Sequence, residues 1–266
     1  MYHHYTVDEH TFFAISNAHE LKNEYLISRT ELVGKLIYEI DRFELLTISL
    51  FLHDIAKGLK GDHSLNGSKI AESLCPRLGL NNDETEIISW CVHNHLFLSE
   101  TAFRYNLNDK KIIEKSTEKI NSIEKLNLLF VLTVCDIKAV GPGVWTDWKG
   151  SLLIELYNKI KIILASKEEK KIAEKEEKKS DHLFNEIRSL NILKHDEAQN
   201  YITNFPNNYW QMYDLKQMLY QAKLFKKMLD SKVKFIFEIY NNLNSNVSEL
   251  IVVAPDNFGL FSKISG

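Results

Sequence analysis

Two apolar segments of the sequence each place an aspartate where the helical pattern calls for a hydrophobic residue. Asp54, which directly follows His53, lies on the same helical stripe as Leu50, four residues earlier. Asp136 ends an apolar run and shares a stripe with Leu132. A buried carboxylate without a partner is costly in free energy, and proteins avoid that cost by pairing, protonation or metal binding. The two aspartates therefore predict a chemical site inside a helical protein.

A histidine near the start of the first predicted helix completes a set of candidate metal ligands. His10 joins His53, Asp54 and Asp136, and the sequence indicates no cation paired with Asp54. Two imidazoles and two carboxylates suit Mn²⁺ or Mg²⁺ best, with Fe²⁺ and Zn²⁺ also acceptable. On the first segment alone, a His53–Asp54 hydrogen bond that only fixes packing explains the pair equally well. Asp136, on a separate segment, is what favours a metal site.

Three further residues are candidates for a chemical role. Lys57 follows His53 by one turn, where a cation would offset charge on a phosphoryl group; the alternative is a lysine that only complements a helix dipole. His63 comes just after the turn that ends this helix. His95 shares an inward stripe with apolar residues, whereas His93 points to another face and is expected at the surface.

The helices that must carry these residues have recognisable ends. Thr6 and Glu9 form a capping-box pattern, so a helix containing His10 should follow. Apolar periodicity and charged first turns predict three further helices, over about residues 43–57, 82–95 and 121–140. Gly58 should end the first of these three, and Asn121 should begin the last.

The second half of the chain changes character twice. In residues 167–179, eleven of thirteen side chains are charged with mixed sign, which favours a solvated helix over a basic arm that binds a partner. Alternation at period two over residues 233–239 and an apolar run at 250–253 predict two strands. Residues 256–260 read as the opening of a helix.

Composition limits the classes of protein that remain. Of 266 residues, 44% are hydrophobic, which allows a buried core, and the net charge of −3 argues against a nucleic-acid partner. Only 10 glycines and 4 prolines disfavour a turn-rich all-β protein. No apolar stretch is long enough to cross a membrane, and the N-terminus lacks the layout of a signal peptide. Three cysteines in apolar runs indicate reduced core residues, so we expect a cytoplasmic protein.

Longer stretches of sequence carry a family resemblance. The pattern of His10, His53-Asp54 and Asp136 resembles the HD superfamily of metal-dependent phosphohydrolases. LFLHDIAKG, GDHSLNG, VHNHLFLSETA and LTVCDIKAVGPGVWTDWKGSLLIELY are similar to the HD domain of the bacterial bifunctional uridylyltransferase/uridylyl-removing enzymes. Further along, FPNNYW continues the similarity and APDNFGLF resembles the opening of an ACT domain.

The resemblance implies a mainly α fold in three parts. We expect an HD phosphohydrolase domain over residues 1–165, a helical linker over 166–231 and a truncated α+β, ACT-like remnant over 232–266. The turn and paired aspartates of a nucleotidyltransferase are missing from this sequence, so the chain is expected to be an internal piece of a longer enzyme. Glutamine is the effector sensed by the family's ACT domains, and the site for it should be incomplete here.

The activity that the resemblance implies is the release of UMP from a uridylylated tyrosine of the PII nitrogen-signalling protein. A metal held by the four ligands would activate water, and Lys57 would counter charge on the phosphoryl oxygens. His63 and His95 correspond to further family histidines, which would bind a second metal or protonate the phenolate.

Alternatives from other classes stay open at this point. One is an HD hydrolase acting on free nucleotides or on guanosine tetraphosphate, although the latter favours an acidic pair where Ile55–Gly58 stands here. The cyclic-dinucleotide branch of the superfamily carries a Gly-Tyr-Pro signature that this sequence lacks. Another is a non-catalytic module that only docks PII.

Overall fold

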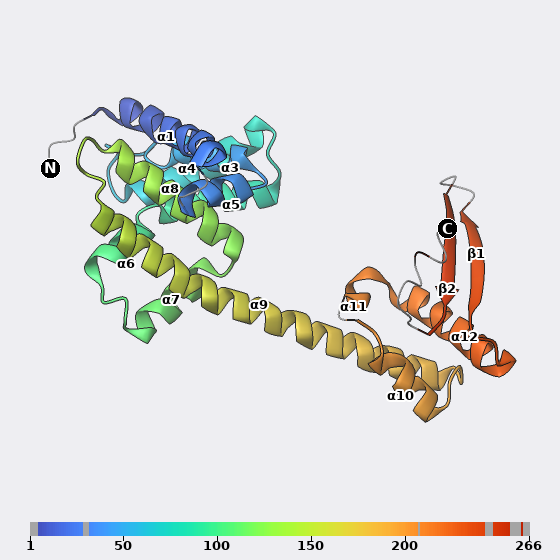
Figure 1. The fold of residues 1–266 in the computed structure, drawn as a ribbon. Helices are drawn as coiled ribbons and strands as arrows, with labels where there is room; N and C mark the ends of the chain where they lie inside the picture. The colour runs from blue at the N-terminus through green and yellow to red at the C-terminus, as the bar shows by residue number, and fades with distance from the viewer. Residues whose placement is uncertain (1–4, 29–31, 207, 243–246, 256–261, 263–266) are drawn as a thin grey trace. The chain divides into compact units, whose positions relative to one another are not determined.

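The computed structural model describes residues 5–28, 32–206, 208–242, 247–255 and 262, and these residues are mainly helical, as predicted (Figure 1). They divide into two units, over residues 1–167 and 168–266, which are described separately here. The first unit contains α1 (Val7–Ser28), α2 (Leu32–Glu39), α3 (Phe43–Leu52), α4 (His63–Leu74), η1 (Cys75–Leu78), α5 (Asn82–Asn94), α6 (Phe97–Arg104), α7 (Lys110–Ile120), α8 (Ile123–Ala139) and the start of α9 (Asp147–Ser189).

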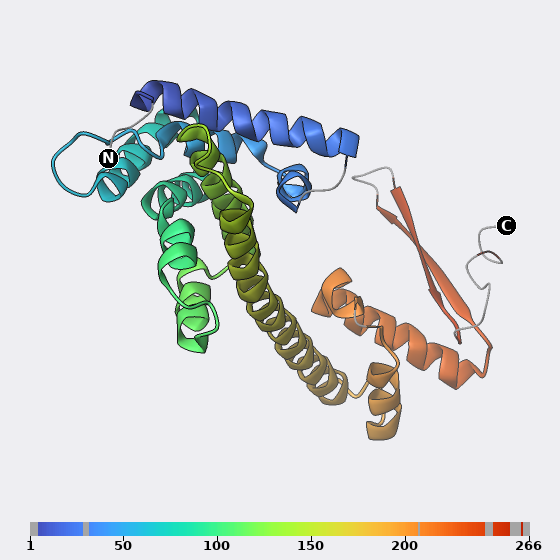
Figure 2. The same ribbon diagram turned by 60° about the vertical axis from the view of Figure 1, so that its left-hand side comes forward.

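Helix α8 is the centre of the first unit. It packs against α1, α2, α3, α5, α6 and α7, in the unit that Figure 2 shows from a second side. Its residues Leu126, Leu129 and Leu132 are fully buried. Because neighbours cover α8 on almost every side, its sequence is apolar nearly all round, as expected for a helix that lies inside a domain. The carboxylate that α8 carries, Asp136, is therefore an exception that demands a partner.

The segment that carries His53 and Asp54 differs from the prediction. Helix α3 ends at Leu52 rather than at Lys57, and short i to i+3 turns follow, with the amide of Lys57 donating to the carbonyl of Asp54 at 2.9 Å. Gly58 then adopts a φ of +98°, which only glycine reaches without strain. His53 and Asp54 are the first two residues after the end of α3, where the helix gives way to these turns.

One predicted helix start and one predicted capping bond need correction. The α8 helix begins after Ser122, whose hydroxyl accepts a hydrogen bond from the amide of Lys125, whereas Asn121 is the left-handed residue that ends α7. At the start of α1, the Glu9 carboxylate accepts bonds from both the amide and the hydroxyl of Thr6, at 3.0 and 2.9 Å. Half of the predicted capping box is thus present, because the Thr6 hydroxyl donates to Glu9 and does not accept from its amide.

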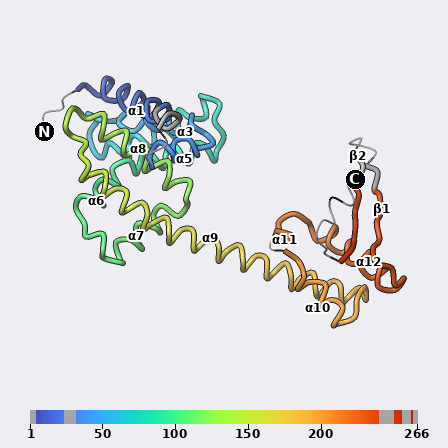
Figure 3. Tube along the Cα trace, viewed as in Figure 1, coloured from blue at the N-terminus to red at the C-terminus, as the bar shows by residue number. Residues whose placement is uncertain are grey.

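The second unit has a small core of its own. It contains the end of α9, α10 (His195–Thr203), α11 (Tyr209–Met212), α12 (Leu215–Ser231), β1 (Ile236–Asn242) and β2 (Val247–Val253). Leu183, Ile187 and Trp210 are among the buried residues that cluster there. The charged stretch at residues 167–179 belongs to α9, whose course is traced in Figure 3. These residues are mostly exposed, as the solvated-helix interpretation predicted.

The two predicted strands form an antiparallel hairpin. Ile236 pairs with Val253 at one end, and the register continues along both strands to Asn242 and Val247. Phe237 and Ile239 are more than half exposed, so the described part of the hairpin leaves apolar side chains uncovered. The predicted helix opening at residues 256–260 lies outside the described residues.

Two findings bear on the environment of the chain. In the part of the chain that the structure describes, no helix combines the length and the apolar composition needed to span a membrane.

The three cysteines are free and buried, and burial raises the pKa of Cys91 and Cys135 to about 12. Their thiols are therefore inert core groups.

We expect a chain shortened to residues 1–231 to keep the first unit folded and to associate less than the full chain. The core of that unit lies entirely within residues 14–164, and the deletion removes the exposed apolar strands, whose free edges promote association. Thermal unfolding by circular dichroism and sedimentation velocity would measure the two effects. Loss of the cooperative transition, or unchanged association, would contradict this view of the units.

Candidate metal centre

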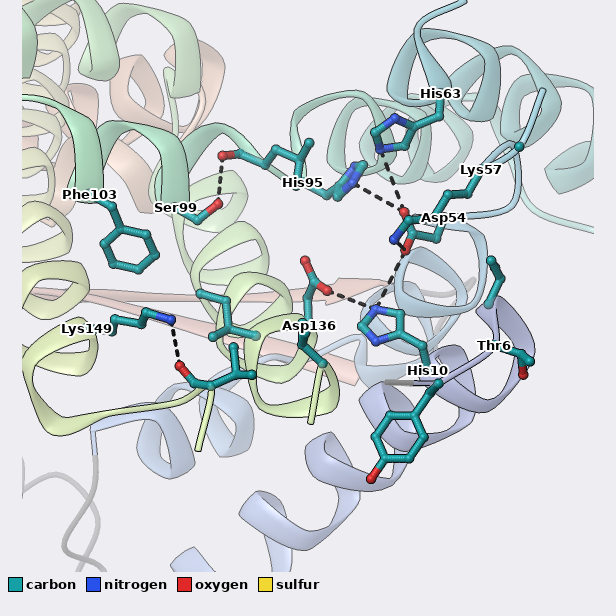
Figure 4. A pocket seen from close by; sticks show the side chains of 17 residues that line it. Thr6, His10, Asp54, Lys57, His63, His95, Ser99, Phe103, Asp136 and Lys149 are labelled. Atoms are coloured by element: carbon teal, nitrogen blue, oxygen red, sulfur yellow. Dashed lines mark hydrogen bonds and ion pairs between the residues drawn. The ribbon is translucent and has the colours of Figure 1, made fainter. Parts of the chain in front are cut away.

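Five separate helices and turns bring the candidate residues together (Figure 4). His10 stands on the first turn of α1, His53 and Asp54 follow α3, and His95 caps the end of α5. His63 is the first residue of α4, whose start is fixed by Asp62, and Asp136 lies near the end of α8. All except the fully buried His53 line one pocket of about 970 Å³.

The first group of ligand atoms consists of the Nε2 atoms of His10 and His53 and one oxygen each of Asp54 and Asp136. The Nε2 atom of His10 lies 3.0 Å from Asp136 Oδ1 and 3.1 Å from His53 Nε2. Asp54 Oδ2 lies 3.7 Å from His10 Nε2 and 3.5 Å from His53 Nε2. An ion held at about 2.1 Å by ligands at right angles would separate their atoms by about 3 Å. These spacings therefore fit a divalent ion with little movement.

A second group lies on the other side of the same aspartate. Asp54 Oδ1 is 3.7 Å from His63 Nε2 and 3.8 Å from His95 Nε2. The two oxygens of Asp54 thus face two different sides. The ligand atoms of His10, His53 and Asp54 lie within 4.8 Å of one another, and so do those of Asp54, His63 and His95, so that each set of three could hold an ion. A carboxylate placed between two such groups is a suitable bridge in a two-ion site.

Backbone carbonyls fix the orientation of two of the imidazoles. The Nδ1 atom of His53 donates to the carbonyl of Leu50 at 2.6 Å, and that of His95 donates to the carbonyl of Val92 at 2.7 Å. A carbonyl can only accept, so the proton must reside on Nδ1. Nε2 of each ring is then directed at the cluster, where the neutral ring offers its lone pair, and a backbone acceptor on Nδ1 is the outer support that metal-binding histidines need.

The charges of the cluster are set by burial and by close contacts. Burial raises the pKa of Asp136, but the hydrogen bonds from His10 and His53 outweigh this effect and lower it, so the carboxylate is ionised. Burial lowers the pKa of His53, and the contact with Asp136 more than reverses that and raises it. For His95, burial and the charge of His53 lower the pKa to about 4, which keeps that imidazole neutral at pH 7.

Lys57 corrects one premise of the sequence analysis. Its Nζ atom lies 2.6 Å from Asp54 Oδ2, so Asp54 does have a cation beside it. Burial raises the pKa of Asp54, but His53 and the bond from Lys57 lower it overall. The Lys57 side chain is about one-third exposed and lines the pocket, where its amine can also reach a bound anion.

The remaining histidines stand apart from the cluster. His93 is exposed while His95 is 1% exposed, as the helical phase predicted. His19, His182 and His195 are exposed as well, and His3 and His4 lie outside the described residues.

Sequence reasoning missed three residues that line the same pocket: Ser99, Phe103 and Lys149. Lys149 lies within the family-like stretch of residues 132–157, but no periodicity or motif singled it out.

Asp54→Asn should lower the affinity for Mn²⁺ at least about tenfold. Replacing a residue that only supports a metal ligand already lowers metal affinity by about 10- to 100-fold, and this substitution removes the negative charge of a carboxylate that faces both groups. Asp41→Asn, at an exposed aspartate away from the pocket, removes the same charge and is the matched control. Titration calorimetry measures the affinity, and circular dichroism checks the fold. Wild-type affinity in Asp54→Asn would show that the cluster does not hold the ion.

Comparison with known proteins is consistent with this geometry. Residues 7–136 match the HD domain family. Over its full length the chain is 38% identical to the bifunctional uridylyltransferase/uridylyl-removing enzyme of Rhodospirillum rubrum and 36% identical to that of Azospirillum brasilense. It spans about 28% of the length of each of these relatives. Residues 7–136 therefore belong to the HD domain family, and the chain as a whole is a relative of the bifunctional uridylyltransferase/uridylyl-removing enzymes.

Proposed function

We propose that this chain is a metal-dependent hydrolase that releases UMP from a uridylylated tyrosine of the PII signal protein. In this reaction the oxygen of water forms a new bond to phosphorus, the bond from phosphorus to the phenolic oxygen breaks, and a proton returns to the tyrosine. The observation that carries the proposal is the ligand cluster at one end of a pocket, in a chain related to enzymes named for uridylyl removal.

The cluster has the donor set that such a hydrolysis needs. His10, His53, Asp54 and Asp136 would hold a divalent ion, with Mn²⁺ or Mg²⁺ suited best to mixed imidazole and carboxylate ligands. Such an ion, when bound, acts as a Lewis acid and lowers the pKa of water toward neutrality. The protein would contribute by holding four donor atoms in place, with Asp54 buried and the side chain of Asp136 only 14% exposed.

The surroundings of the two remaining histidines support different roles for them in this proposal. His95 is buried, neutral and oriented through Nδ1, as a metal ligand requires. The side chain of His63 is 31% exposed and faces the pocket, so it can exchange protons with solvent and donate one to the departing phenolate. A phenol has a reference pKa of about 10, so its departure needs only modest acid assistance.

Lys57 would stabilise the charge that develops on the phosphoryl oxygens. Its amine already neutralises part of the charge of Asp54 at 2.6 Å. An anionic diester in the pocket would share this amine, and preorganised cations of this kind lower the free energy of a charged transition state.

The direct test is release of UMP from uridylylated PII by the metal-free chain, with and without added Mn²⁺. We expect release only with the metal, and the Asp41→Asn control should match the wild type. Binding of PII without any release would identify a docking module instead. Faster hydrolysis of free uridine nucleotides than of uridylylated PII would identify a nucleotide hydrolase.

A second expectation separates the two neighbouring histidines of α5. His95→Gln should lower kcat by about 100-fold or more, the usual effect of losing a catalytic acid, base or ligand, while His93→Gln should leave it nearly unchanged. The reason is that His95 Nε2 lies 3.8 Å from Asp54 Oδ1, whereas His93 is exposed. Steady-state rates at saturating Mn²⁺ measure this, and equal losses in both variants would contradict the assignment.

A further inference from the structure

The pocket continues well beyond the metal cluster. Its other end is formed by one face of α6, the connection between α8 and α9, and the first turns of α9. Ser99, Phe103 and Lys149 lie there, and Asp136 stands between them and the histidines in the close view (Figure 4). The hydrolytic chemistry described above uses none of these three side chains.

Lys149 is held by uncharged groups. Its amine donates to the carbonyl of Val144 at 2.6 Å and lies 5.9 Å from the centre of the Phe103 ring. Within the described part of the chain it has no carboxylate within ion-pair distance, in contrast to Lys57, which Asp54 neutralises. Lys149 therefore presents remaining N–H donors and a full positive charge to the pocket.

Ser99 offers the opposite hydrogen-bonding character. Its hydroxyl donates to the carbonyl of Leu96 at 2.9 Å, so the lone pairs of its oxygen are left to accept. Ser99 and Phe103 are four residues apart on α6 and therefore share one face of that helix. This end of the pocket combines an apolar ring, a donor and an acceptor.

We propose that this end binds the uracil base of the uridylyl group, an inference that rests on the proposed function. Uracil presents carbonyl oxygens on either side of an N–H. Lys149 would donate to a carbonyl, Ser99 would accept from the N–H, and Phe103 would contact the ring. Cytosine carries an amine and an unprotonated nitrogen at the matching positions, so it would face Lys149 and Ser99 with the wrong polarity.

The other planar group of the substrate is the tyrosine ring, which remains attached to a folded protein. It must enter from the open side of the pocket, where Thr6, Val7 and Gly58 are exposed. Ser99, Phe103 and Lys149 are only partly exposed. The uridine is the free end of the substrate and is the part that can be enclosed there.

The experiment measures binding of UMP, CMP, ribose 5-phosphate and O-phosphotyrosine to the full chain in Mn²⁺ by titration calorimetry. The wild type should bind UMP more tightly than CMP and ribose 5-phosphate. Lys149→Met should weaken UMP binding about tenfold, the effect of losing one charged hydrogen bond, and leave ribose 5-phosphate binding unchanged. Ser99→Ala should reduce the preference for UMP over CMP.

Lys161→Met is the matched control. Lys161 is also on α9, and its amine lies 5.5 Å from the centre of an aromatic ring, that of Tyr157, but it does not line the pocket. This variant should bind every ligand as the wild type does.

Three results would overturn the uracil site. Equal weakening of UMP and ribose 5-phosphate binding by Lys149→Met would place Lys149 on the phosphate. Weakening of O-phosphotyrosine binding alone would place the tyrosine ring at this end. Equal affinity of the wild type for UMP and CMP would show that the base is not recognised there. Metal-dependent release of UMP from uridylylated PII, measured on the same samples, decides the parent proposal separately.

Discussion

The buried carboxylate of Asp54 is the constraint on which the site depends. The residue is 2% exposed, and a charged group so placed is tolerated only when cations or hydrogen-bond donors compensate for the lost water. Lys57 supplies one cation at 2.6 Å, and imidazoles approach both oxygens at 3.5–3.8 Å. These compensating groups lie on both sides of the carboxylate, so Asp54 has the position of a bridge between two groups of ligands.

The fold meets this constraint through its central helix and one tightened turn. Because neighbouring helices cover α8 on almost every side, the side chain of Asp136 is only 14% exposed, and the packing of α1 against α8 brings Nε2 of His10 within 3.0 Å of its carboxylate. The consecutive residues His53 and Asp54 follow the end of α3 at Leu52, and Nε2 of His53 lies 3.5 Å from Oδ2 of Asp54 in the cluster. The packing contacts that stabilise this unit therefore also position the candidate ligands.

The two units differ in the size of their apolar cores and in the apolar side chains that they leave exposed. The first encloses a continuous apolar core around the cluster, whereas the second holds a smaller core and an antiparallel hairpin with exposed apolar side chains such as Phe237 and Ile239. A long helix, α9, belongs to both units, and its charged middle stays helical because mixed charges at i,i+4 spacing suit an exposed helix. The ligand cluster is made entirely by residues of the first unit.

The sequence by itself determined the helical class, the two strands and the candidate ligands, because an aspartate on an apolar stripe stands out against the period of a helix. His95 could be separated from His93 for the same reason. Only the tertiary structure decided that Lys57 pairs with Asp54 and that His63 faces the second oxygen of that aspartate. Helical periodicity reports which face of a helix is buried, but not which face of another helix it meets. For that reason Ser99 and Lys149, fifty residues apart, could be assigned to one pocket only after folding had placed α6 beside the start of α9.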